Sequence, residues 1–140
     1  MMGDEKNRAA IERMRELLSG GDLSARARAM EEFASEDLVE EWPQSGERIR
    51  GLANVRKLNA GYSGATGTSP KMEPRRVIGG GDVYVVEGTI DYGDGTPVSY
   101  VGIAELRDGK IVKMTEYFAN PFEAPAWRAD IVERMDKVPV

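Results

Sequence analysis

The sequence predicts a single domain of the α+β class, and three observations lead to that prediction. Amphipathic helical spacing fills the first 34 residues. Four runs with strand character, separated by glycine-containing turns, fill the second half of the chain. The order is helices, a strand, a helix, four strands and a final helix, which is typical of α+β proteins. A length of 140 residues suits one domain over residues 1–140 with a sizeable core.

Two helices open the chain. The first is predicted over residues 4–19, because apolar positions recur there at helical spacing: Ala10, Ile11, Met14, Leu17 and Leu18. Gly20 and Gly21 end this helix, since glycine accepts the left-handed conformation at a helix stop. Asp22 is a natural N-cap for the second helix. Both helices need a sheet or other helices to cover their apolar stripes.

A short strand is expected over residues 38–42, and residues 43–46 predict a turn. Helical spacing returns after Gly51 and continues to Tyr62. The small and polar residues 63–70 predict a mobile loop inside the domain.

The second half predicts a strand meander over residues 72–78, 83–92, 98–107 and 110–118. Asp108-Gly109, between the last two strands, is a strong hairpin signal. Pro125 suits the first turn of a last helix. On that helix the residues Trp127, Ile131 and Met135 share one face, so Trp127 is expected to dock the helix over the domain.

Composition excludes several kinds of chemistry. The chain has no cysteine and no histidine, which removes disulfides, thiolate nucleophiles, imidazole bases and histidine metal sites. Carboxylate spacing fits no known metal loop, so we expect no metal and no cofactor. A net charge of −5 argues against a nucleic acid as a partner. No apolar run is long enough for a signal peptide or a membrane span. We therefore expect a cytoplasmic protein.

The chain resembles the SnoaL-like branch of the nuclear transport factor two-like superfamily. The resemblance is carried by residues 18–23 with Phe33, by residues 42–51, and by residues 108–112 running into residues 116–118. It implies a cone-shaped α+β roll, related to the cystatin fold, in which a curved mixed sheet wraps around the N-terminal helices and leaves one pocket. It also implies pairing as dimers through the sheet. The superfamily includes ketosteroid isomerases, limonene-epoxide hydrolases, polyketide cyclases and non-catalytic binders, so the fold alone does not decide the function.

The chemistry of these relatives does not transfer intact. Met14 and Val101 stand where a ketosteroid isomerase has its oxyanion donors, although Glu41 is near the position of the base. Glu116 matches one acid of the epoxide hydrolases, but the strand over residues 99–103 lacks their Arg-x-Asp pair. The histidine of SnoaL-type cyclases has no counterpart in the chain.

Strand alternation provides a separate argument. A two-residue turn at Asp108-Gly109 would place Val101 opposite Glu116 and Ile103 opposite Met114, on one face with Phe118. Both faces of this sheet are apolar, and the helices can cover only one of them. A second subunit is the simplest covering for the other face, so we expect a homodimer through the sheet.

Two sets of residues are candidates for a functional site. Glu116 and Glu41 are the candidate catalytic acid and base, because burial among apolar side chains would raise the pKa of Glu116. The alternatives are that an arginine neutralises Glu116 structurally and that Glu41 belongs to a solvated strand end. The candidate ligand-binding residues, which could equally be core, are Trp42, Tyr62, Val101, Ile103, Met114, Phe118 and Trp127.

Three functions remain open at this point. The first is a protein that binds a small hydrophobic molecule in the cone pocket without catalysis. The second is an isomerase, cyclase or hydrolase that uses the pocket carboxylates as general acid and base. The third is a protein-binding scaffold, which a shallow and filled cone would favour.

Overall fold

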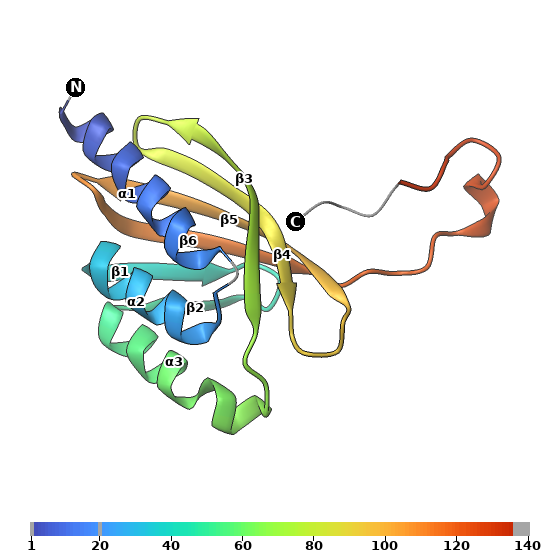
Figure 1. The fold of residues 1–140 in the computed structure, drawn as a ribbon, viewed down its shortest axis with the longest axis horizontal. Coiled ribbons are helices and arrows are strands. Elements are labelled where there is room, and N and C mark those ends of the chain that lie inside the picture. The colour runs from blue at the N-terminus through green and yellow to red at the C-terminus, as the bar shows by residue number, and fades with distance from the viewer. Residues whose placement is uncertain (1, 20, 136–140) are drawn as a thin grey trace.

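The computed structural model describes residues 2–19 and 21–135, and it confirms the α+β prediction. In Figure 1 three helices lie across one face of a strongly curved sheet. The helices are α1 (Met2–Leu18), α2 (Leu23–Phe33) and α3 (Leu52–Thr66). The strands are β1 (Ala34–Trp42), β2 (Glu47–Arg50), β3 (Lys71–Gly80), β4 (Val83–Asp91), β5 (Pro97–Arg107) and β6 (Lys110–Ala119).

The sheet is mixed. Its order is β2-β1-β6-β5-β4-β3, so the four-strand meander is extended by the first hairpin of the chain. β1 lies parallel to β6, and the other neighbouring pairs are antiparallel. This topology brings the carboxyl ends of β1 and β6 to the same end of the molecule, although 77 residues separate Trp42 from Ala119 in sequence.

The core lies between the helices and the inner face of the sheet. Its fully buried side chains include Ile11 of α1, Leu38 of β1 and Ile111 of β6. Asn7, which is 3% exposed, fixes α1 over the hairpin turns: its amide donates to the carbonyl of Gly81, and its carbonyl accepts from the backbone N–H of Gly109. The predicted cap is confirmed, because the Asp22 carboxylate accepts from the N–H groups of Ser24 and Ala25.

The predicted turn at Asp108-Gly109 forms, with Arg107 opposite Lys110, but the predicted register of β5 against β6 is wrong. A β-bulge after the turn leaves Val112 as an extra residue, since Leu106 pairs with Ile111 and Glu105 with Lys113. One inserted residue moves a whole strand to the other face. Tyr100, Gly102 and Ala104 therefore face the helices together with Met114, Glu116 and Phe118, whereas Val101 and Ile103 face outward.

Two further expectations need correction, and one strand was not expected. Residues 47–50, for which the sequence predicts no element, form β2. Helix α3 continues to Thr66, through half of the segment expected to be a loop. The last helix does not form: residues 126–128 make a single 3₁₀ turn, and Trp127 is 79% exposed. Short helices are marginal in water without a surface that buries their apolar stripe, and within the described residues this segment has none. No helix in the described part of the chain is long and apolar enough to cross a membrane.

Candidate functional site

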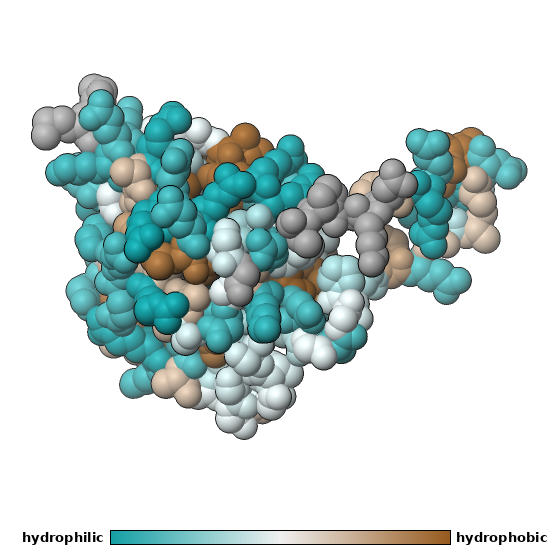
Figure 2. Space-filling view, viewed as in Figure 1, coloured by the Kyte–Doolittle hydropathy of each residue, from teal (hydrophilic) through white to brown (hydrophobic). Residues whose placement is uncertain are grey.

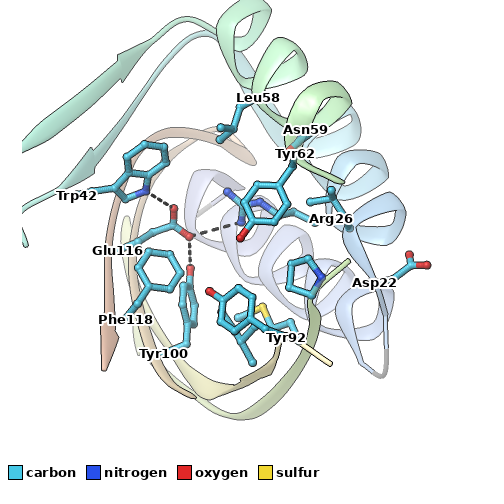
Figure 3. Close-up of a pocket in the computed structure, with 14 residues that line it drawn as sticks. Asp22, Arg26, Trp42, Leu58, Asn59, Tyr62, Tyr92, Tyr100, Glu116 and Phe118 are labelled. Carbon is cyan, nitrogen blue, oxygen red and sulfur yellow. Dashed lines mark hydrogen bonds and ion pairs between the residues drawn. The ribbon is translucent and has the colours of Figure 1, made fainter. Parts of the chain in front are cut away.

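A cavity of about 310 Å³ opens at the end of the sheet where β1 and β6 finish. Figure 3 shows its lining, which comes from the first turns of α2, the second half of α3 and the inner face of the sheet. The apolar walls are formed by Leu23, Trp42, Leu58, Pro70, Met72, Ile90, Tyr100 and Phe118. A volume of this size lies at the small end of the ~300–1,000 Å³ of ligand pockets.

Glu116 lies at the base of the cavity and is 1% exposed. Its carboxylate accepts three hydrogen bonds: from Trp42 Nε1 at 3.0 Å, from the Tyr100 hydroxyl at 2.5 Å and from Arg26 Nη1 at 3.4 Å. The donors come from β1, β5 and α2, so the carboxylate joins both sides of the cone. Figure 3 shows these three contacts converging on one side of the cavity.

Arg26 also binds a second buried carboxylate. Its Nη2 lies 3.0 Å from Glu40 Oε1, and Glu40 is fully buried on β1. The other oxygen of Glu40 has no hydrogen-bond partner among the described residues. Two buried carboxylates thus share one guanidinium. Glu116 accepts hydrogen bonds from three side chains, whereas Glu40 accepts one from Arg26.

Burial raises the pKa of Glu40 to about 7. The charge of Arg26 acts in the opposite direction, and the charge of Glu116 raises the pKa further. Burial alone would lower the pKa of Arg26, but the charges of Glu116 and Glu40 raise it above its ordinary value. Burial, followed by the charge of Glu116, also raises the pKa of Tyr100. Tyr100 is therefore a permanent hydrogen-bond donor to Glu116 at neutral pH.

Two more tyrosines face the cavity from opposite sides. Tyr62 reaches in from α3, Tyr92 from the end of β4, and both hydroxyl groups point toward Glu116 in Figure 3. Neither hydroxyl has a hydrogen-bond partner within the described residues. Burial, together with the nearby Tyr62, raises the pKa of Tyr92, so this phenol keeps its proton. The pair offers two O–H donors to whatever fills the cavity.

The structure brings together Glu116, Trp42, Tyr62 and Phe118 of the residues singled out in the sequence. Met114 lies deeper in the core beside Arg26 and Tyr100, outside the lining of this cavity. Val101 and Ile103 lie on the opposite face of the sheet because of the bulge in the β5–β6 hairpin. Trp127 lies in the segment beyond β6, away from the cavity.

Glu41 is not the partner of Glu116. It points to the outer face, where Arg48 Nη2 lies 2.6 Å and Lys113 Nζ 3.0 Å from its carboxylate, and hydrogen bonds from Lys113 and Arg48 lower its pKa. Its neighbour Glu40 faces inward instead. The alternation of β1 carried this signal, since Leu38 and Glu40 must share a face.

Sequence reasoning also missed Arg26, Tyr92 and Tyr100. Arg26 lies three residues after Leu23 and four before Met30, which places an arginine on the apolar stripe of α2 and could have revealed it. Tyr100 alternates with Val101 along β5, so the wrong register puts Tyr100 on the outer face. Tyr92 follows the last residue of β4, where alternation no longer defines a direction.

Comparisons of the sequence and of the structure with known proteins point to the same family. The family model of the SnoaL-like domain matches residues 11–114. An NTF-2 like protein of unknown function from Burkholderia xenovorans LB400 is 37% identical, with a TM-score of 0.70, 97% of this chain covered and 100% of that chain. A protein provisionally assigned as a ketosteroid isomerase from Kribbella flavida is 25% identical, with a TM-score of 0.79 and coverages of 97% and 95%.

An epoxide hydrolase from M. tuberculosis, described as LEH-like, shares the fold at 22% identity, with a TM-score of 0.59 and coverages of 83% and 84%. No curated protein sequence matches the chain significantly. The match of the family model over most of the sheet and helices, together with the relative at 37% identity, establishes the relationship. The chain belongs to the SnoaL-like domain family, within the NTF2-like fold.

Proposed function

We propose that the protein binds a small, flat and largely apolar molecule in the cavity above Glu116. The observation that carries the proposal is a cavity of about 310 Å³ with aromatic and aliphatic walls, into which the hydroxyl groups of Tyr62 and Tyr92 project without a protein partner among the described residues. Polar groups of this kind in an apolar pocket fix the orientation of a ligand. The ligand should therefore carry a hydrogen-bond acceptor such as a carbonyl oxygen.

The charges around the cavity favour an uncharged ligand. Arg26 is the cation that lines it, and its guanidinium already binds Glu40 and Glu116. Asp22, at the mouth, is engaged as the cap of α2. A ligand carboxylate or phosphate would meet acidic groups without a free positive charge to pair with.

The arrangement of Glu116 favours binding over catalysis. A general base must reach the proton it removes, at about 2.6–3.2 Å. Both oxygens of Glu116 are engaged by Trp42, Tyr100 and Arg26, and Glu41 lies on the other face of the sheet. An isomerase, cyclase or hydrolase remains the second candidate, because Glu116 borders the cavity and the Kribbella relative carries a ketosteroid isomerase assignment.

Calorimetric titration with two matched probes, 1-tetralone and tetralin, tests the proposal. The two differ by one carbonyl group, and two phenol donors should favour the ketone about tenfold, at ~1.4 kcal/mol per factor of ten. Tyr62→Phe with Tyr92→Phe should remove this preference and keep tetralin binding. Tyr84→Phe, whose hydroxyl lies outside the lining of this cavity, is the matched control. Equal affinities in the unsubstituted protein, or no binding of either probe, would contradict the proposal.

A homodimer through the outer face of the sheet is part of the same proposal. The face carries a row across four strands in which Thr115, Ile103, Val85 and Ile78 are successive cross-strand partners. Ile78 is 52% exposed in the single chain, and a second subunit would cover it. The cytoplasmic location expected from the sequence stays a prediction.

A further inference from the structure

The segment after β6 is an arm that extends away from the rest of the protein. Figure 1 shows residues 120–135 leaving the end of the sheet and running outward. The backbone hydrogen bonds within it are local, from Ala129 to Ala126 and from Ile131 to Arg128. Figure 2 shows hydrophobic atoms on this arm, apart from the body. Its large exposed side chains are Phe122, Trp127, Ile131, Val132 and Met135.

These side chains are unusual for a free tail. Tails that stay disordered contain few aromatic and β-branched residues, whereas Phe122 and Trp127 are 81% and 79% exposed here. A long run of exposed apolar side chains marks a segment that binds a surface. The arm thus lacks a partner within the described part of its own chain.

The same chain carries a second surface without a cover. Ile103 and Val85 lie at the centre of the outer sheet face, with Tyr117 and Val101 in the adjoining row. Ion pairs flank this centre: Glu41 with Arg48 and Lys113 on one side, and Glu87 with Arg75 and Arg76 on the other. An apolar centre with a charged rim is the usual anatomy of a protein interface.

We propose that the arm of one protomer binds across the outer sheet face of a second copy of this chain, so that two arms clasp the dimer reciprocally. Burying the large side chains of one arm removes roughly 700 Å² of surface, close to the ~800 Å² per partner of a stable interface. Each arm departs from the end of β6, and β6 also carries Thr115 and Tyr117 of the receiving face. A two-fold arrangement then satisfies both surfaces at once.

The alternative is an arm that folds back over its own cavity. The cavity of about 310 Å³ is too small to hold all five large apolar side chains of the arm. The other apolar residues of the arm, spread from Phe122 to Met135, would stay in water. The number and spread of these side chains therefore favour the large sheet face of a second copy.

Cross-linking tests the arrangement directly, because the chain contains no cysteine of its own. We would place one cysteine at Ala129 in the arm and one at Thr115 on the outer face, both in the same chain, and oxidise the full-length protein. The inference predicts disulfide-linked dimers on a non-reducing gel, with the 129–115 peptide identified by mass spectrometry. Glu12→Cys, on the exposed side of α1, replaces Thr115→Cys in the matched control. A 129–115 disulfide within one chain, or linkage no greater than in the control, would overturn the inference.

A second measurement does not depend on the geometry of a disulfide. Phe122→Ser with Trp127→Ser changes exposed side chains only, so folding should be unaffected. Sedimentation equilibrium should show a dimer dissociation constant at least tenfold higher than that of the unsubstituted protein. An unchanged dissociation constant, or an unsubstituted chain that is already monomeric, would overturn the arm's role. The inference rests on the dimer in the proposed function, and tetralone binding, measured separately, tests the ligand part of that proposal independently.

Discussion

Gly102 lies directly opposite Glu116 across β5 and β6, and the missing side chain leaves room for the ring of Tyr100. A methyl group at position 102 would lie 2.4 Å from the Tyr100 hydroxyl, the atom that donates to Glu116. The short hydrogen bond at the base of the cavity therefore depends on a glycine two residues away. A single added methyl group, in Gly102→Ala, therefore tests whether this hydrogen bond stabilises the protein.

Gly102→Ala should lower the free energy of unfolding by about 2.5–6 kcal/mol. Overpacking costs ~1–3 kcal/mol, and the loss of a hydrogen bond to a charged group costs a further ~1.5–3 kcal/mol. Urea denaturation at pH 7 measures the change. Gly80→Ala in β3 is the control, since nothing lies within 4 Å of an added methyl group there. Equal stabilities for the two variants would contradict this view of the cavity base.

Glu40 should make the stability of the protein depend on pH. Arg26 of α2 and Glu116 of β6 face it, and its folded pKa of about 7 lies above the ordinary value of 4.5. The folded state thus holds a proton that the unfolded chain releases between these values. The stabilisation from that proton is complete below pH 4.5 and is lost as pH rises to 7. Glu40→Gln should flatten this decline and match or exceed the wild-type stability at pH 8, as urea denaturation from pH 5 to 8 would show.

Arg26→Gln should be the most damaging change in the cluster. It leaves Glu40 and Glu116 buried with no cation, and breaking a buried ion pair by removing one partner costs ~3–5 kcal/mol. Arg13→Gln is the matched control, because Arg13 pairs with Glu16 on the exposed side of α1. Thermal unfolding of both variants at pH 7 compares them, and an Arg26 variant as stable as the Arg13 variant would rule out a structural role for the cluster.

Leu58→Trp should fill the cavity and abolish tetralone binding while the protein stays folded. Leu58 is half-buried on α3 and lines the cavity without belonging to the core cluster. A larger side chain there occupies the ligand space, so affinity should fall at least a hundredfold. Calorimetry measures the affinity, and circular dichroism checks the fold. Unchanged binding in a folded variant would place the ligand elsewhere.

The sequence was sufficient for the architecture because its signals are local. The helical spacing ahead of Gly20, the Asp22 cap and the Asp108-Gly109 turn each determine backbone conformation within a few residues. The site depends on register instead. One extra residue, Val112, shifts the register of β6 against β5. As a result Tyr100 faces the pocket, and Val101 does not. No property of Val112 itself announces a bulge.

The helix predicted near the C-terminus does not form, and the reason is different. Trp127, Ile131 and Met135 have true helical spacing, but periodicity predicts a helix only where a surface buries the stripe. Glu40 and Glu41 are neighbours on β1, and only one of them can face the cavity. Which one does depends on the alternation of the strand, and the structure turns Glu40 inward and Glu41 outward.

We propose that Glu116 is a fixed hydrogen-bond acceptor that shapes a binding cavity and does not transfer protons. The free energy of unfolding of Glu116→Gln, measured by urea denaturation at pH 8, tests this role. Trp42, Tyr100 and Arg26 would lose their shared charged acceptor, so the variant should be less stable than wild type by about 2 kcal/mol. A Glu116→Gln protein that equals or exceeds the wild-type stability would contradict this role and favour an enzyme that uses Glu116 as an acid or base.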